Sequence, residues 1–166
     1  EVTFGVILLA IANKEPKIFT LMELLHLFLK HRKTVIIRRT IFDLEKAKAK
    51  AHILEGLKIA LDNIDAIIDL IKKSADSAEA KAGLVEKFAL SELQAGAILD
   101  MRLNRLTGLE REKIENELKA LMEEIEKLSA ILRSETLLNN LIKDELLELK
   151  NKFKVPRITE IVEDYD

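Results

Sequence analysis

The sequence predicts a mainly α fold: a long antiparallel coiled-coil hairpin that carries a small helical tip, with short β-strands near its two ends. Two long segments repeat apolar residues with heptad spacing, and a strongly apolar segment lies between them. The composition agrees, since Leu, Ile, Ala, Lys and Glu dominate and there are only five Gly, two Pro, one Tyr and no Trp. That profile is typical of long helices rather than of a compact mixed fold.

Length and charge set further limits. The 166 residues suit one domain or one elongated unit, and the net charge of −2 predicts no global attraction to nucleic acid or to an anionic membrane. There is no Cys, which excludes disulfides and fits a cytoplasmic location. The apolar run from Val6 to Ala12 is too short to span a bilayer. Because the chain begins with Glu inside an expected strand, we expect it to be a piece of a larger protein.

Residues 1–33 are expected to form a strand followed by a helix. Glu1 to Ala12 is apolar and β-branched, and Asn13 to Lys17 has turn composition. We expect the strand to pair with the short run Arg157 to Val162 or with a segment outside this sequence. Thr20 and Glu23 have capping-box spacing and open a helix that reaches about Arg32. Its expected buried face consists of Leu21, Leu24, Leu25, Phe28 and Leu29.

Residues 34–73 are expected to form the outgoing limb of the hairpin. The segment holds no Pro and one Gly, so we expect one helix of about forty residues, or roughly 60 Å at 1.5 Å per residue. Its apolar residues step alternately by three and four positions: Leu54, Leu57, Leu61, Ile64, Ile68 and Ile71.

Residues 74–108 are expected to form the tip. After the break at Ser74 to Ser77, a short helix of about residues 78–88 leads into the apolar segment Leu90 to Glu110. Ser91 with Gln94, and Thr107 with Glu110, have capping-box spacing and mark two helix starts. The segment is apolar on two faces. One face can pack on the hairpin, and the other is left for a second copy of the chain.

Residues 109–154 are expected to form the returning limb, interrupted or capped at Ser134. Pro156 ends it, and residues 155–166 follow as a short strand and an acidic tail. The two limbs have similar expected lengths, so antiparallel pairing would bury both apolar stripes. The returning stripe consists of Ile114, Leu118, Leu121, Ile125, Leu128, Leu132, Leu138, Ile142, Leu146, Leu149 and Phe153.

The residues show no catalytic, metal-binding or cofactor-binding pattern. His26, His31 and His52 have no metal-ligand spacing, and no glycine-rich phosphate loop is present. We therefore expect no catalytic residue, cofactor or metal in this segment, and we interpret the histidines as core or surface residues.

One basic cluster is a candidate DNA contact. It consists of Lys30, Arg32, Lys33, Arg38 and Arg39. The alternatives are a solvated helix junction and pairing with carboxylates elsewhere in the chain. The limbs argue against a nucleic-acid stripe, because residues 34–73 carry eight basic and six acidic residues and residues 109–153 carry eight and eleven.

Three long strings resemble the A subunits of type IIA DNA topoisomerases. They are HRKTVIIRRTIFDLEKAKAKAHILEGLKIALDNID (residues 31–65), LSELQAGAILDMRLNRLTGLEREKI (residues 90–114) and KFKVPRITEI (residues 152–161). The resemblance covers essentially the whole chain and is greatest to the A subunits of DNA gyrases. The A-type subunit of topoisomerase IV is the nearest alternative within the family.

The resemblance implies the end of a tower domain over residues 1–33, followed by a coiled-coil arm whose tip dimerises as the exit gate, or C-gate. It implies an enzyme that passes one DNA duplex through another, in an A2B2 complex with a B subunit that hydrolyses ATP, with Mg²⁺ also used elsewhere. The family's nucleophilic tyrosine lies in a domain absent here, and Tyr165 matches no such motif. Our candidates for the twofold contact are Leu90, Gln94, Ile98, Leu99, Arg102 and Leu103.

Two other functions remain as alternatives. The chain could be a nucleic-acid-binding helical arm, like the tRNA-reaching hairpin of some aminoacyl-tRNA synthetases, or a structural spacer with no gate. The near-neutral limbs weigh against the first, and a tip that stays monomeric would favour the second.

Overall fold

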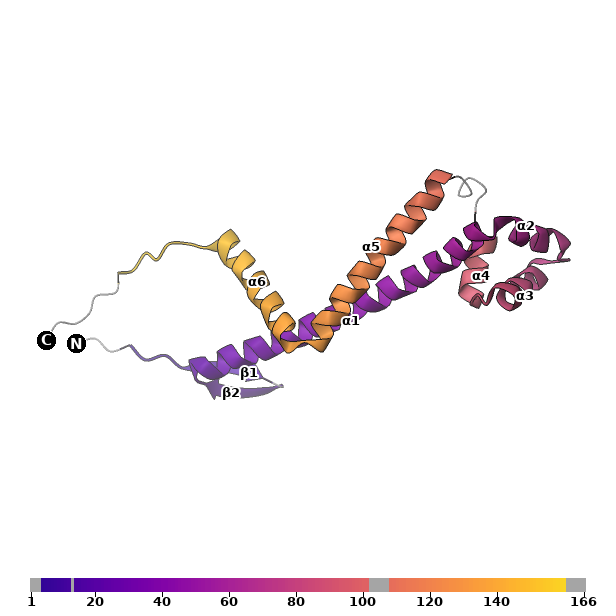
Figure 1. Ribbon diagram of the computed structural model, residues 1–166. Coiled ribbons are helices and arrows are strands. Elements are labelled where there is room, and N and C mark those ends of the chain that lie inside the picture. Colours follow the sequence, from indigo (N-terminus) through magenta and orange to yellow (C-terminus); the bar gives the residue numbers. More distant parts are fainter. Residues whose placement is uncertain (1–3, 13, 102–107, 161–166) are drawn as a thin grey trace. The chain divides into compact units, whose positions relative to one another are not determined.

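The structure, a computed structural model, describes residues 4–12, 14–101 and 108–160. Its elements are predominantly helical, which confirms the mainly α prediction (Figure 1). They are, in order, β1 (Leu8–Ala12), β2 (Glu15–Phe19), α1 (Leu21–Asp62), α2 (Ile64–Lys73), α3 (Ser77–Phe88), α4 (Glu92–Leu99), α5 (Gly108–Arg133) and α6 (Glu135–Phe153). They form two compact units, described separately below: a terminal unit (residues 1–39 and 132–166) and a central unit (residues 40–131).

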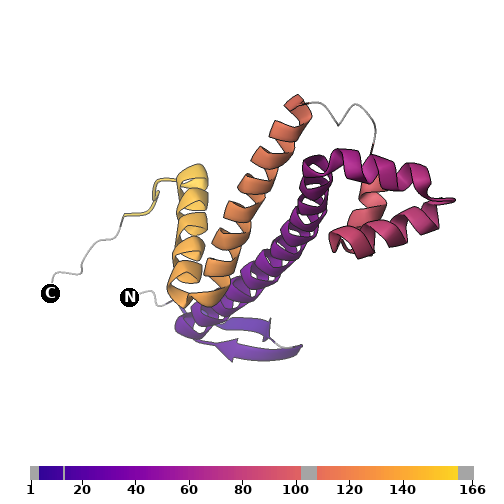
Figure 2. The same cartoon turned by 45° about the vertical axis from the view of Figure 1, so that its right-hand side comes forward.

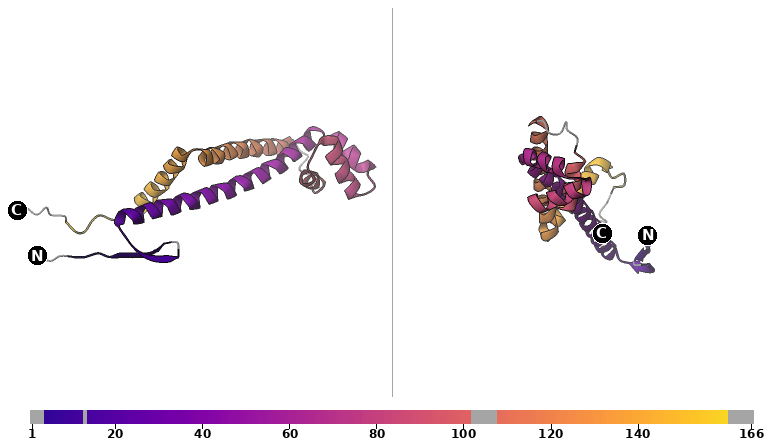
Figure 3. Two further views of the ribbon diagram at one scale, coloured as in Figure 1. Left: turned by 90° about the horizontal axis from the view of Figure 1, so that it is seen from below. Right: turned by 90° about the vertical axis from the view of Figure 1, so that its right-hand side faces the viewer.

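The terminal unit begins with a β-hairpin that the sequence analysis missed. β1 and β2 pair antiparallel (Figure 3). Leu8 lies opposite Phe19, and Ile11 lies opposite Pro16. The expected turn over residues 13–17 is confirmed at Lys14 but is shorter than predicted, because Glu15 to Lys17 already belong to β2. Proline is tolerated because both strands of a two-stranded sheet are edge strands. Lys14, in the loop between the strands, has a φ of 71°, as tight hairpin turns require.

The expected C-terminal strand is also wrong where the structure describes it. Residues 154–160 have no strand, and residues 161–162 lie outside the described part of the chain. The β-branched composition of this run indicated an extended segment. A strand also needs a partner, and the sheet of the described residues pairs β1 with β2 and not with this run.

The capping box at the start of α1 is confirmed. The backbone N–H of Thr20 donates to Glu23 Oε2 at 2.8 Å, and the backbone N–H of Glu23 donates to Thr20 Oγ1 at 3.2 Å. The helix then continues through the expected boundary at residue 33 as far as Asp62. Its expected buried face is wrong for most positions, since four of the five side chains are exposed: Leu21, Leu25, Phe28 and Leu29.

Helix α6 begins where the sequence indicated an interruption. Ser134 is its N-cap, and the backbone N–H of Leu137 donates to Ser134 Oγ at 3.3 Å. Leu138 and Ile142 are buried as predicted. The apolar stripe does not continue to the end of the helix, because Leu149 and Phe153 are exposed.

In the central unit, α1 and α5 run antiparallel, as the sequence predicted. Asp62 pairs with Arg111 and Lys50 pairs with Glu117, so the later part of one helix meets the earlier part of the other. The heptad residues of the two helices form one core. It includes Leu54, Leu57, Leu61, Ile114 and Leu121.

The expected continuous helix to Lys73 is interrupted at Asn63. The backbone there leaves the helical region, with φ −123° and ψ 31°, and the side-chain amide donates to the carbonyl of Ile59 at 2.9 Å. Asparagine competes in this way for backbone groups, which favours helix ends. The break changes which face is buried, because Ile67 lies in the core and Ile71 is exposed.

Helices α2, α3 and α4 form the tip (Figure 2). Asp76 caps α3 by accepting a hydrogen bond from the Glu79 backbone N–H at 2.8 Å. Ala89 adopts the left-handed conformation at φ 53° and turns the chain from α3 towards α4. Leu84 is fully buried and shares a core with Leu90 and Ala95. The second expected capping box starts at Thr107, which lies outside the described residues.

Candidate interaction sites

The start of α4 is held by a complete capping box. The Ser91 hydroxyl accepts a hydrogen bond from the Gln94 backbone N–H at 3.1 Å, and the Ser91 backbone N–H donates to Gln94 Oε1 at 2.9 Å. This confirms the helix start predicted from the spacing of the two residues. Gln94 is nevertheless only 6% exposed, so its side chain faces the chain's own interior.

Three of the six residues expected to contact a second copy face inward in the same way. Leu90, Gln94 and Ile98 are buried, and Leu99 packs partly buried against the same core. Their spacing of four residues places them on one side of the chain around α4. Arg102 and Leu103 lie outside the described residues. The structure describes one copy, so contact between two copies stays a prediction, but these buried side chains belong to the intramolecular core.

The outward face of α4 is different. Leu93 is 72% exposed, the most exposed apolar side chain of this helix. A Cβ atom added at Gly96, one turn further on, would meet no heavy atom within 4 Å. Leu93 is not among the six residues expected to contact a second copy, because spacing along the chain does not show which side of α4 packs against α1. Leu93 is therefore the better candidate for contact with another molecule.

The basic cluster on α1 is largely paired with carboxylates of α6. Arg32 Nη2 lies 2.6 Å from Glu145 Oε2, and Arg39 pairs with the other oxygen of the same carboxylate. Lys33 Nζ lies 2.8 Å from Glu135 Oε1. The Lys33 hydrogen bond, and then its charge, lowers the pKa of Glu135 below the ordinary value. Pairing with carboxylates, one alternative to DNA contact, is thus confirmed for three of the five residues.

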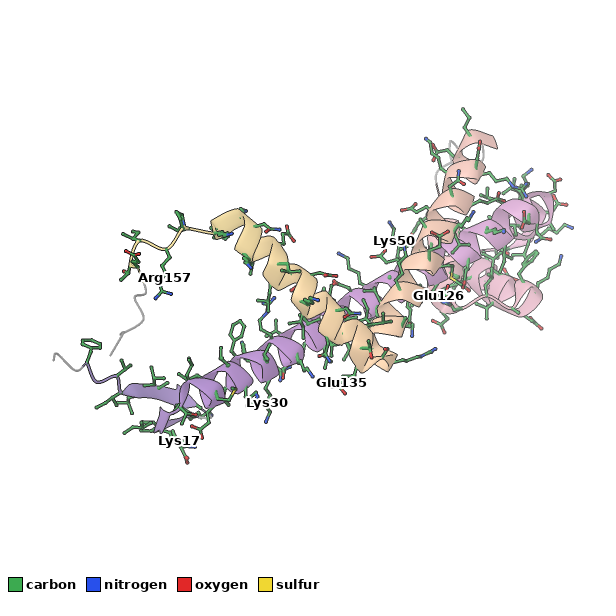
Figure 4. All side chains as sticks on the ribbon, turned by 60° about the vertical axis from the view of Figure 1, so that its left-hand side comes forward. Lys17, Lys30, Lys50, Glu126, Glu135 and Arg157 are labelled. Carbon is green, nitrogen blue, oxygen red and sulfur yellow. The ribbon has the colours of Figure 1, made fainter. Side chains whose placement is uncertain are left out.

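The other two members of the cluster, Lys30 and Arg38, have exposed side chains. Lys30 points into solvent from α1, and Glu135 stands at the beginning of α6 (Figure 4). The cluster therefore has much less free positive charge than its sequence indicated.

Within the described ranges, no three His, Cys, Asp or Glu side chains are grouped as they would be around a metal ion. Of the histidines, His52 has polar partners in the central unit, described below. No helix in the described part of the chain is both long and apolar enough to cross a membrane.

Comparison with known proteins gives consistent matches along the chain. A family model for the A subunits of DNA gyrase and topoisomerase IV matches residues 1–147. The DNA gyrase A subunit of Campylobacter fetus is 74% identical over all 166 residues, which are 19% of that relative's length. The DNA gyrase A subunit of Helicobacter pylori is 64% identical over the whole chain, which is 20% of that relative's length. The one of Clostridium acetobutylicum is 54% identical over 96% of the chain, which is 19% of that relative's length. The chain spans about a fifth of the length of these curated relatives.

Proposed function

This chain belongs to the family of DNA gyrase and topoisomerase IV A subunits, and on that basis we propose that it forms the coiled-coil arm and homodimeric exit gate of a DNA gyrase. In this role the tip holds two A subunits together until a transported DNA duplex leaves. The high identity to gyrase A subunits supports gyrase over topoisomerase IV. It also argues against a synthetase-type RNA-binding arm or a simple spacer.

The observation that carries the proposal is the combination of this family match with Leu93, the most exposed large apolar side chain of helices α2, α3 and α4. A gate must close firmly but open reversibly, so its contact should be apolar and small. Leu93 on α4 meets that need, because it projects from a short helix whose opposite side is anchored in the core.

The rest of the reaction is assigned to other parts of the enzyme. We propose an A2B2 complex in which the B subunit hydrolyses ATP and Mg²⁺ is bound outside this segment. The DNA is cut by a tyrosine of another domain, so this chain alone should neither cleave nor supercoil DNA. It should work in the cytoplasm as part of an ATP-dependent isomerase.

Dimerisation tests the proposal directly. Sedimentation equilibrium over a concentration series should show a reversible dimer, and Leu93→Glu should weaken it at least tenfold by placing two carboxylates at the contact. Leu149→Glu changes an exposed leucine of α6 and serves as the control that should leave the dimer intact. Leu99→Glu should also weaken the dimer, but it is a less specific test. Leu99 packs against the core, so this substitution would also destabilise the tip.

A crosslink gives an independent measurement. The chain contains no cysteine, so Leu93→Cys can form a disulfide only with a second copy. Oxidation should yield a covalent dimer on a non-reducing gel for Leu93→Cys and little for Leu149→Cys. A chain that stays monomeric at every concentration, with no crosslink at residue 93, would contradict a gate at this surface.

A further inference from the structure

The capping box of α4 has a second set of partners, on α1. Gln94 Nε2 donates a hydrogen bond to the backbone carbonyl of His52 at 2.7 Å. The Ser91 hydroxyl, which caps α4, lies 2.7 Å from His52 Nε2. The two side chains that begin α4 are therefore also the polar groups that join it to α1.

The hydrogen bonds of this cluster are mutually satisfied. With the proton of His52 on Nε2, the ring donates a hydrogen bond to Ser91 Oγ. The unprotonated Nδ1 can then accept from Gln94 Nε2, which lies 3.5 Å away. Gln94 Oε1 accepts from the Ser91 backbone N–H, and its Nε2 donates to the His52 carbonyl. Because Gln94 is buried, its side-chain amide has lost its hydrogen bonds to water. Without these partners, the desolvation of the amide would destabilise the folded state.

Gly56 makes this close approach possible. A Cβ atom at this position would lie 2.6 Å from Gln94 Cγ and 2.7 Å from Gln94 Cβ, which is closer than real contacts allow. Gln94 Cβ is attached directly to the backbone of α4, so rotating the side chain cannot relieve the clash. Any residue larger than glycine would push α4 away from α1.

We propose that His52, Gly56, Ser91 and Gln94 form a latch that fixes α4 on α1. Helix α4 has only eight residues and is too short to be stable by itself, so its position depends on such contacts. The latch lies on the inward side of α4 and Leu93 on the outward side. The latch residues thereby act as positioning residues for Leu93, a consequence that rests on the proposed gate.

Hydrogen exchange at a protein concentration low enough to keep the chain monomeric tests the latch itself. Gly56→Ala should speed exchange of the α4 amides at least tenfold while leaving those of α6 unchanged. Gly96→Ala is the matched control, because its added Cβ meets nothing, and it should not speed α4 exchange. If Gly56→Ala does not fold, Gln94→Met keeps the side-chain length, removes the hydrogen bonds and should give a smaller but equally selective increase. Exchange that rises equally in α4 and α6, or in neither, would overturn the latch.

Sedimentation equilibrium then tests the link to Leu93. We expect Gly56→Ala and Gln94→Met to raise the Kd of the dimer about tenfold, although neither residue lies on the outward face. A selective increase in α4 exchange with an unchanged dimer Kd would overturn the link. A wild-type chain that is monomeric would instead contradict the proposed gate, and the exchange data would still decide whether the latch exists.

Discussion

Single residues in this protein often have roles that depend on one neighbouring group. Gln94 illustrates this, because the same amide completes a capping box within α4 and bonds to the His52 carbonyl on α1. Leu84 and Leu93 show the contrast among apolar residues. Leu84 is completely buried, whereas Leu93 is 72% exposed, although the two lie nine positions apart in the tip.

That contrast predicts very different costs of truncation. Leu84→Ala should lower the free energy of unfolding by about 2–5 kcal/mol, because it removes buried apolar surface and leaves a cavity. Leu93→Ala should change it by less than about 0.5 kcal/mol in the monomer. Urea unfolding followed by circular dichroism at low protein concentration measures both. Equal costs would mean that the tip core is not packed around Leu84.

The pKa of Glu23 predicts that the stability of the first turn of α1 depends on pH. The backbone N–H of Thr20, and then the hydrogen bond from Lys17, lowers the pKa of Glu23 below its ordinary value. A carboxyl group whose pKa is lowered by folding stabilises the folded state above its unfolded pKa, and this contribution is lost as the pH falls through the folded pKa. The start of α1 should therefore fray under acidic conditions.

Carbon NMR of the Glu23 carboxyl over a pH series checks this, with exchange of the first α1 amides as a second readout. Glu23→Gln should abolish the pH dependence of that fraying. Lys17→Met should raise the pKa of Glu23 only in part, because the Thr20 hydrogen bond remains. A titration of Glu23 at its ordinary value would refute the capping box in solution.

At the scale of elements, the structure is governed by where helices are interrupted. Asn63 separates α1 from α2, and Ser134 caps α6 just after α5 ends. The interruption at Asn63 changes the buried face of the helix that follows, as Ile67 shows in α2. Paired charges also join neighbouring helices, as where Arg32 and Arg39 of α1 both pair with Glu145 of α6.

Removing the charge of Glu145 should expose those arginines to other anions. We expect Glu145→Gln to bind a short DNA duplex several-fold more tightly at low salt. The slope of log K against log salt should steepen by about one to two units, because Arg32 and Arg39 become free to contact phosphates. Fluorescence anisotropy over a salt series measures both quantities.

Glu148→Gln provides the matched control, since it removes the same charge from an exposed position of α6. A comparable gain in DNA affinity for both variants would indicate a general charge effect and not release of the two arginines. If neither variant gained DNA affinity, the basic cluster would be excluded as a DNA contact.

For the whole molecule, the proposed dimer connects stability to concentration. Association stabilises the folded chain by mass action, so the melting temperature should rise with protein concentration. Each tenfold increase in concentration contributes about 1.4 kcal/mol per dimer. Leu93→Glu should show a lower melting temperature at high concentration and almost no concentration dependence. Calorimetry at several concentrations tests this, and a flat response for the wild type would argue against a stable dimer.

Much of the structure could be predicted because its determinants are local. Capping boxes act over three residues and heptad stripes over three or four, so the starts of α1 and α4, the cap of α6 and the paired stripes of α1 and α5 were all visible in sequence. The long strings around residues 31–65 and 90–114 also indicated the family that the comparisons then showed.

The tertiary structure decided what depends on segments far apart in the chain. Gly56 lets α4 approach α1, and this turns Gln94 and Ile98 inward and Leu93 outward. Glu145 neutralises Arg32 across 113 positions, which no local pattern could reveal. Spacing along a helix determines which residues share a face, but the neighbour that covers a face determines whether it is core, ion pair or contact surface.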